Sequence, residues 1–215
     1  LPIVVVGIGA GLSYEDSGPT HHALEDLAIM RALPGIVIWN VTDSVMAGKV
    51  AEIVYQENLP AYVRLDREVT KPFCGEDWNF KRGIVKLHSG DYVKNIAILA
   101  TGNMIFEAFD LAQQHGFACI DIFRFPIDQE CLKWHIEDYD SLITLEEHFL
   151  PGGLGSAVAE VMADQGLKIT LHRIGIQAGA EYSYVYGGRE RIRSEGYGIG
   201  RERIEALIGE ISQGF

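Results

Sequence analysis

Short apolar runs alternate along the chain with segments whose apolar residues recur at helical spacing. The predicted strands are 3–6, 36–39, 61–65, 95–102, 118–122, 141–147 and 168–174. The predicted helices are 20–33, 43–56, 104–115, 128–135, 153–165 and 201–211. Because strands followed by helices build parallel βαβ units, we predict an α/β fold with mainly parallel sheets.

Capping residues support these boundaries. Asp43 stands where a helix N-cap is needed, and Gly116 and Gly166 stand where C-caps are needed. The first run, "IVVV" (3–6), lacks polar alternation, which is typical of a strand buried on both faces.

A weakly periodic stretch divides the chain. Residues 66–91 contain Pro72, Gly75, Gly83 and Gly90 and show only a short candidate strand at 84–87. We therefore predict a first α/β unit at 1–75, a linker at 76–92 and a second unit at 93–215, each with a three-layer arrangement. Residues 176–200, rich in Gly and Tyr, are predicted to be a loop.

Composition narrows the possible partners. The 215 residues carry 18 Lys and Arg against 30 Asp and Glu, a formal net charge of −12, which argues against nucleic acid and anionic membranes. The apolar runs have strand length, so none is expected to span a bilayer. Three widely spaced cysteines, Cys74, Cys119 and Cys131, predict buried free thiols and fit a cytoplasmic protein.

The stretch "EDSGPTHHALED" (15–26) places two adjacent histidines at a predicted helix start, with carboxylates on both sides. The helix dipole there would disfavour the cationic form of His21 or His22, while Asp16, Glu25 and Asp26 would favour it. A neutral imidazole could exchange a hydrogen bond with a substrate oxygen. The alternative is a capping and surface role.

Arg64 and Arg67 leave a predicted strand at its carboxyl end. They could converge on a phosphate by bidentate contacts, or they could form surface salt bridges. The later arginines alternate with glutamates, which is typical of a solvated face; they are Arg189, Arg191, Arg193, Arg201 and Arg203.

Two glycine-rich turns follow predicted strands. "GIGAG" (7–11) does not match a dinucleotide loop, because the third glycine would fall on Leu12. "GGLGSA" (152–157) could hold an anion on a helix start or let the helix pack closely on a strand. The preceding Glu146, Glu147 and His148 could belong to a site, bond the local loop or contact a partner chain.

Longer motifs resemble a known family. "GPTHHALEDLAIMRALPG" (18–35) and "PAYVRLDR" (60–67) are similar to the second half of the pyrimidine-binding domain of transketolases. "SLITLEEHFLPGGLGSAVAEVMADQG" (141–166) resembles the transketolase C-terminal domain. This last segment is similar as well to deoxyxylulose-phosphate synthases and to beta subunits of 2-oxoacid dehydrogenases, whereas the Gly-Pro-Thr-His segment favours transketolase-like enzymes over the dehydrogenase beta subunits. The first unit is therefore expected to be an incomplete pyrimidine-binding domain.

The resemblance implies transfer of a two-carbon ketol unit between sugar phosphates, with thiamine diphosphate and Mg²⁺ held between subunits. By this comparison His21 is the active-site histidine, and Arg67 binds the substrate phosphate, with Arg64 as a weaker match. Ser17 replaces an aspartate that contacts a substrate hydroxyl, and Asp16 is the nearest carboxylate. A further substrate histidine of the family falls on Gly9.

Several family features are absent from this sequence. The glutamate and aromatic residues that grip the aminopyrimidine precede the matched segment, and no Gly-Asp-Gly diphosphate motif occurs. We expect a fragment or C-terminal subunit that binds no cofactor alone and is inactive without a diphosphate-binding N-terminal partner. Exposed strand edges predict a homodimer. The alternatives are a beta-type 2-oxoacid decarboxylase or dehydrogenase subunit, a deoxyxylulose-phosphate synthase-like enzyme, and a non-catalytic assembly or regulatory module.

Overall fold

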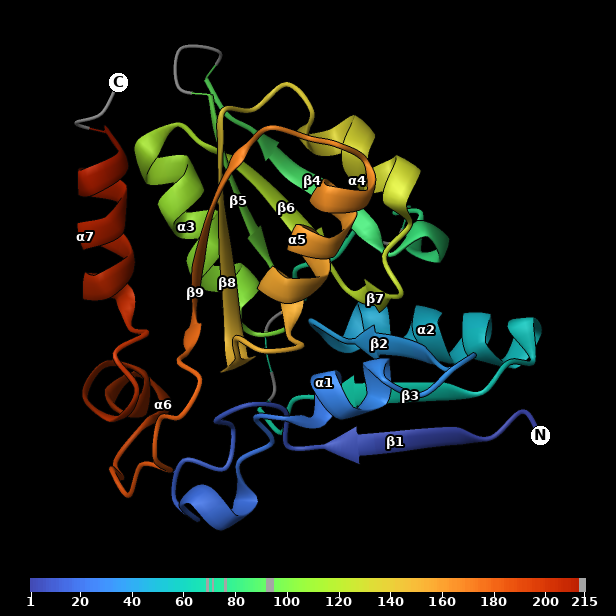
Figure 1. Ribbon diagram of the computed structural model, residues 1–215. Helices are drawn as coiled ribbons and strands as arrows, with labels where there is room; N and C mark the ends of the chain where they lie inside the picture. Colours follow the sequence, from blue (N-terminus) through green and yellow to red (C-terminus); the bar gives the residue numbers. More distant parts are fainter. Residues whose placement is uncertain (69, 71, 76, 92–94, 213–215) are drawn as a thin grey trace.

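The computed structural model describes residues 1–68, 70, 72–75, 77–91 and 95–212, which form two β-sheets flanked by helices (Figure 1). Most neighbouring strands run parallel. The α/β class predicted from the alternation of apolar runs and helical segments is therefore confirmed.

The first sheet has the strand order β1-β3-β2-β7. Its strands are β1 (Val4–Ile8), β2 (Val37–Asn40), β3 (Ala61–Leu65) and β7 (Arg124–Phe125), of which only β7 is antiparallel to its neighbour. Helix α2 (Ser44–Glu57) packs on one face against Trp39 and Val63. Helix α1 (Asp26–Arg31) lies on the other face through Leu27.

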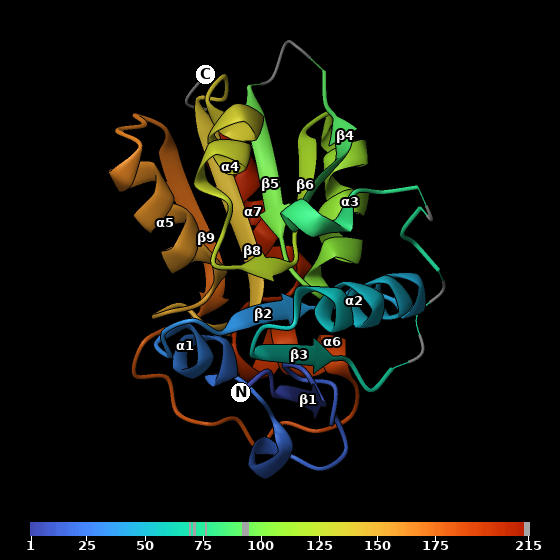
Figure 2. The same ribbon diagram turned by 90° about the vertical axis from the view of Figure 1, so that its right-hand side faces the viewer.

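Strand β1 is not buried on both faces as predicted. Val4, Val5, Val6 and Ile8 are between 44% and 64% exposed. The reason is its position at the edge of the sheet, where it pairs only with β3 and no described helix covers it (Figure 2). Its apolar side chains therefore form an exposed apolar surface.

The second sheet has the order β4-β6-β5-β8-β9. Its strands are β4 (Ile84–Ser89), β5 (Ile96–Ala100), β6 (Ala118–Ile122), β8 (Ser141–Phe149) and β9 (Thr170–Ile176), with β4 antiparallel to β6. Helices α3 (Met104–His115) and α7 (Arg201–Ser212) cover one face, and α4 (Gln129–Ile136) and α5 (Leu154–Asp164) cover the other.

The segment between the two units contains regular structure. The strand predicted at 84–87 is present as β4, preceded by a 3₁₀ turn at Phe80–Arg82. Residues 76, 92 and 93, which define the predicted linker boundaries, lie outside the described residues, so those boundaries stay a prediction. The three cysteines are free and buried, as predicted.

The helix predicted at 20–33 is wrong in its first half. Pro19–His21 forms a 3₁₀ turn, and α1 begins only at Asp26. The cause lies in Ala23, whose N–H donates to Gly11 and whose carbonyl accepts from Gly11, so its backbone cannot join a helix. By contrast, Asp43 caps α2 as predicted, accepting from the Met46 amide at 2.9 Å.

The two sheets share part of their apolar core. Leu27, Ile38 and Tyr62 of the first unit pack in one cluster with Leu99 and Ile120 of the second. This packing brings the carboxyl end of β8 next to the turn that follows β1, close to α6 (Arg189–Arg191) (Figure 1). Among the helices of the described residues, none combines the length and apolarity needed to cross a bilayer.

Candidate functional site

The turn after β1 folds back over the end of β3. The amides of Gly9 and Ala10 both donate to the carbonyl of Leu65, at 2.9 and 3.1 Å. Gly11 then exchanges backbone hydrogen bonds with Ala23. Residues 9–23 therefore form a closed loop that carries the Gly-Pro-Thr-His segment at the carboxyl end of the first sheet, where ligand sites of α/β proteins are usually built.

Tyr14 brings two of the predicted site residues together. Its ring lies 5.6 Å from the ring of His21, centroid to centroid, and the guanidinium of Arg67 stands over the same ring at 5.0 Å. Gly9 makes room for the ring, because a Cβ there would meet Tyr14 at 2.2 Å. An imidazole, a phenol and a guanidinium thus share one exposed surface, an arrangement suited to an anionic, hydroxylated ligand.

His21 is exposed, and Thr20 Oγ1 lies 2.9 Å from its Nδ1. It belongs to the 3₁₀ turn, so the predicted placement of the histidines on the first turn of an α-helix is wrong. His22 is buried, at 8% exposure, so its interpretation as a surface group is also wrong. Burial lowers the pKa of His22, which favours a neutral imidazole.

Arg64 lies inside the protein. Its Nε donates to Asp26 at 2.7 Å, and its Nη2 donates to the carbonyl of Ala23 at 2.7 Å. Its Nη1 faces Asn40. Arg64 therefore stabilises the loop from the protein interior through Ala23. It is not exposed beside Arg67 to bind a phosphate, and it does not form a surface salt bridge, so both predictions for it are wrong. Burial raises the pKa of Asp26, but Arg64 outweighs this and holds it below the ordinary value.

Asp16 and Ser17 form the exposed tip of the loop. The Ser17 amide donates to the carbonyl of Tyr14 at 3.1 Å, which fixes the tip beside the Tyr14 ring. No described hydrogen bond joins either side chain to His21. Their assignment to substrate binding stays a prediction.

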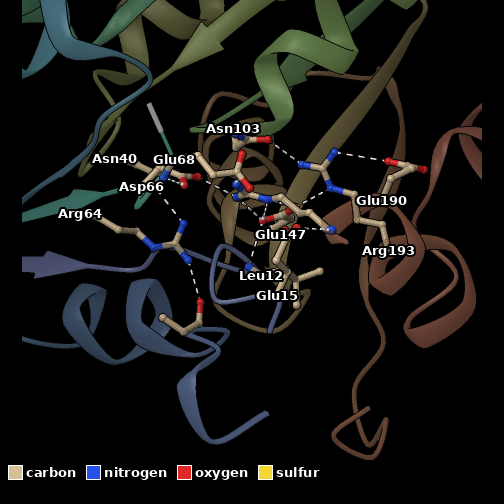
Figure 3. A network of polar contacts seen from close by, with 12 residues as sticks. Leu12, Glu15, Asn40, Arg64, Asp66, Glu68, Asn103, Glu147, Glu190 and Arg193 are labelled. Carbon is tan, nitrogen blue, oxygen red and sulfur yellow. Dashed lines mark hydrogen bonds and ion pairs between the residues drawn. The ribbon is translucent and has the colours of Figure 1, made fainter. Parts of the chain in front are cut away.

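Sequence reasoning missed a buried charge cluster behind this loop. Glu147, 4% exposed, accepts from the Nε of Arg193 at 2.5 Å and from Arg189, whose Nη2 lies at 2.6 Å (Figure 3). Burial raises the pKa of Glu147, but Arg193 and Arg189 outweigh it and hold it far below its usual range. The prediction of a solvated face is therefore wrong for Arg189 and Arg193.

One signal in the sequence could have revealed the cluster. Glu147 ends the strand predicted at 141–147, next to the apolar run "LITL", and a carboxylate that becomes buried there needs a cationic partner. Arg189 and Arg193 are four residues apart, which is the spacing that places two side chains on one side of a helical turn. Their distance from Glu147 along the chain hid the pairing.

The backbone amides of the turn "GGLGSA" bind a carboxyl group of the protein itself, that of Glu146. Glu146, fully buried, accepts from the amides of Leu154 and Gly155 at 2.7 and 2.9 Å. A Cβ at Gly153 would meet Glu146 Oε2 at 1.9 Å, so close packing also requires this glycine. Burial raises the pKa of Glu146 to about 7. His148 is buried too, and its Nε2 accepts from the Ala28 amide, which ties α1 to β8.

These residues do not fit the diphosphate end of thiamine diphosphate. The amides that a diphosphate would use at the start of α5 are bonded to Glu146. The described ranges gather no group of three His, Cys, Asp or Glu side chains that could hold a metal ion.

Two family models match the chain. Residues 1–72 match the pyrimidine-binding domain of transketolase, and residues 88–185 match the transketolase C-terminal domain. The chain belongs to the transketolase family. The Gly-Pro-Thr-His loop and Arg67 fall in the first matched region, and Glu147 falls in the second.

Individual relatives agree with the models. The chain is 30% identical to an apulose-4-phosphate transketolase subunit of Actinobacillus succinogenes, over 95% of this chain and 66% of that protein. It is 34% identical to a putative transketolase C-terminal section of Methanocaldococcus jannaschii, over 82% of this chain and 57% of that protein. The chain thus spans about two thirds or less of these relatives.

A solved structure shares the fold. It is described as "Split gene transketolase, inactive beta4 tetramer", with a TM-score of 0.76 and 27% identity. The match covers 96% of this chain and 65% of that chain. The arrangement of the two α/β units is therefore that of a split transketolase.

Proposed function

We propose that this chain is the C-terminal section or subunit of a thiamine-diphosphate-dependent transketolase that moves a two-carbon ketol unit between sugar phosphates. The observation that carries the proposal is the contact of Tyr14 with both His21 and Arg67 on the Gly-Pro-Thr-His loop. A sugar phosphate needs a cationic group for its phosphate and hydrogen-bonding groups for its oxygens, and this surface offers both.

The side chains take separate roles in the proposal. Arg67 binds the phosphate, because its guanidinium is exposed and its face rests on Tyr14. His21 exchanges a hydrogen bond with an oxygen near the reacting carbon. Ser17 and Asp16, at the tip of the loop, contact a substrate hydroxyl. Arg64 keeps the loop in place through Ala23.

Thiamine diphosphate supplies the group that stabilises a carbanion when it is bound. In the proposal its diphosphate, with Mg²⁺, is held by an N-terminal, diphosphate-binding partner subunit or domain, because the helix start in this chain is occupied by Glu146. The description of the related structure as an inactive assembly of beta chains supports the need for a partner. The Actinobacillus succinogenes relative, named as one subunit of a transketolase, supports the same division.

The exposed β1 strand supports self-association or coverage by a partner. Its apolar side chains and its free edge are surfaces that proteins ordinarily cover. We propose a homodimeric arrangement within the complete enzyme. The net charge of −12 supports a protein that binds neither nucleic acid nor membranes, and the three buried free cysteines support a cytoplasmic location.

The proposal is tested by titrating thiamine diphosphate and Mg²⁺ into this chain alone and into the chain mixed with its diphosphate-binding partner, with binding followed by calorimetry. Saturable binding is expected only in the mixture, together with transfer from a ketose phosphate and no turnover of pyruvate. Tight binding by this chain alone, or turnover of pyruvate instead of the ketose, would contradict it. Unchanged turnover in a His21→Ala variant would favour a non-catalytic assembly module.

A further inference from the structure

Arg189 contacts the residue before Arg67 and the residue after Tyr14. It lies in α6, far along the chain from the first sheet, and its side chain is 8% exposed. Its Nη2 is 2.7 Å from Asp66, the residue directly before Arg67. Its backbone N–H donates to Glu15, the residue directly after Tyr14, at 2.6 Å.

The same guanidinium is anchored in the second sheet. Its Nε donates to Glu147 at 2.8 Å, and its Nη2 donates to the other carboxylate oxygen at 2.6 Å. Glu147 also accepts from the Leu12 amide at 3.1 Å. Arg189 and Glu147 together therefore connect β8 to the start of the loop and to the segment that carries Arg67. Figure 3 shows Glu147 with Leu12 and Asp66 around it.

The charges around Arg189 indicate which residues would be displaced if its guanidinium were removed. Asp66 and Glu147 are 8% and 3% exposed, and both face the Nη2 of Arg189. Without the guanidinium, two carboxylates in a poorly solvated space would repel each other. Asp66 follows the end of β3 and belongs to no helix or strand, whereas Glu147 is held within β8, so we expect the displacement to fall on Asp66 and Arg67.

The residues that precede Arg189 also lie close to the loop. The Tyr182 hydroxyl donates to Glu25, and the Tyr186 hydroxyl lies where a Cβ of Gly18 would approach it to 2.5 Å. The segment from Tyr182 to Arg189 therefore follows the loop from its carboxyl end back to Glu15. Arg189 supplies the buried ionic contact of this segment.

We propose that Arg189 is a positioning residue that sets the geometry of Arg67 and of the His21 loop from the C-terminal domain. Its guanidinium acts through Asp66 and through Glu147, which holds the Leu12 amide, and it does not touch the substrate. The contact with Glu15 comes from the backbone N–H and is kept in every variant at this position. The contacts of Arg189 do not depend on the proposed function, but its expected effect on the binding of a sugar phosphate rests on that function.

Arg193 provides a matched control. It is buried to a similar degree and pairs with the same Glu147 carboxylate at 2.5 Å. Its other partners, Asn103 at 2.7 Å and Glu190 at 3.5 Å, belong to the second unit, and no described contact joins it to Asp66 or Glu15. Replacing Arg193 therefore weakens the same buried cluster without releasing Arg67.

The experiment compares Arg189→Gln, Arg189→Lys, Arg193→Gln and Arg193→Lys in the assembled enzyme, by steady-state kinetics and by hydrogen exchange. For Arg189→Gln the KM of the phosphorylated ketose is expected to rise about tenfold or more, the effect of losing one charge-assisted contact, with kcat within about twofold. The KM of the matching unphosphorylated ketose, which lacks the contact with Arg67, is expected to rise less. Amide exchange of residues 9–22 is expected to accelerate, and Arg189→Lys is expected to recover part of both effects.

Arg193→Gln is expected to leave both the KM and the exchange of residues 9–22 unchanged while lowering stability. Equal effects of the two Gln variants on KM and exchange would overturn the inference, as would unaltered exchange of residues 9–22 in Arg189→Gln. If a Gln variant does not fold, the two Lys variants carry the same comparison. If the unaltered enzyme shows no ketol transfer, the proposed function fails, and the exchange data still decide whether Arg189 positions the loop.

Discussion

The backbone N–H of Leu12 donates to the Glu147 carboxylate at 3.1 Å, joining residues 135 positions apart in the chain. Leu12 lies in the loop that carries His21, and Glu147 lies near the carboxyl end of β8. A strand of the C-terminal domain therefore fixes a loop of the pyrimidine-binding domain. The stability of this joint and the geometry of the candidate site depend on the same buried carboxylate.

Replacing Glu147 with Gln is expected to destabilise the protein strongly. The substitution keeps the size of the side chain but leaves Arg189 and Arg193 buried without a full counter-charge. Removing one member of a buried ionic cluster costs about 3–5 kcal/mol, and the free energy of unfolding from urea titration measures it.

Glu190→Gln is the control for this substitution. Glu190 also faces Arg193, but its side chain is 56% exposed and the contact is 3.5 Å. The expected loss is below about 1 kcal/mol because water screens an exposed pair. Similar losses in the two variants would mean that Glu147 is not the centre of the cluster.

Gly11→Ala is expected to disrupt the contact between the loop and Glu147 by a steric clash. Gly11 has a φ of +59°, and an added Cβ would meet Glu147 Oε2 at 2.3 Å. Gly35→Ala is the matched control, because Gly35 has a φ of +78° with nothing within 4 Å of the added atom. The control should lose about 1–2 kcal/mol from the left-handed backbone alone.

The Gly11→Ala variant should lose about 1–3 kcal/mol more than the control because the added methyl group overpacks the joint. Thermal unfolding of the two variants beside the unaltered protein measures the difference. If both variants melted at the same temperature, the close approach of Gly11 to Glu147 would have no energetic weight.

Asp121 is expected to make stability fall as the pH rises. It lies in β6 with no solvent exposure and accepts from the Thr42 hydroxyl at 3.0 Å. Burial raises the pKa of Asp121 to about 8, with Asp43 adding to the effect and Thr42 opposing it. The unfolded chain releases this proton near pH 4, so the contribution is complete below about pH 4 and is lost by about pH 8.

Asp121→Asn removes the ionisation and keeps an oxygen for Thr42. The variant is expected to be more stable than the unaltered protein at pH 8, and its stability should vary less between pH 5 and pH 8. Urea unfolding at each pH measures this, with the exposed Asp138→Asn as the control. A variant that is less stable at pH 8 would show that the carboxylate is ionised and paired in the folded protein.

The alternation of apolar and amphipathic segments predicted most elements of the fold. Helix α2 with its Asp43 cap and helix α3 with its Gly116 cap follow the local sequence, because capping and periodicity act over a few residues. The failures came from partners that are distant along the chain. Ala23 bonds Gly11 and interrupts a helix, and β1 lies at a sheet edge although its composition is that of a buried strand.

The candidate site was predicted in part. The Gly-Pro-Thr-His motif identified His21, and the end of β3 identified Arg67, whose contact with Tyr14 appears only in three dimensions. Arg64 looked equivalent to Arg67 along the chain, yet it points inward to Asp26. The pairing of Glu147 with Arg189 could not be predicted, because the spacing of charges within a segment does not show which segments meet.

The role of His21 is tested most directly by measuring ketol transfer by this chain in complex with its diphosphate-binding partner. Three forms of the chain are compared: the unaltered protein, His21→Ala and His172→Ala. His172 is a half-exposed histidine of β9 and serves as the matched control. We expect kcat/KM to fall at least about a hundredfold for His21→Ala, the loss typical of a hydrogen-bonding or proton-transferring group, and to be unchanged for His172→Ala. A His21→Ala enzyme with unaltered kcat/KM would show that His21 has no part in the transfer.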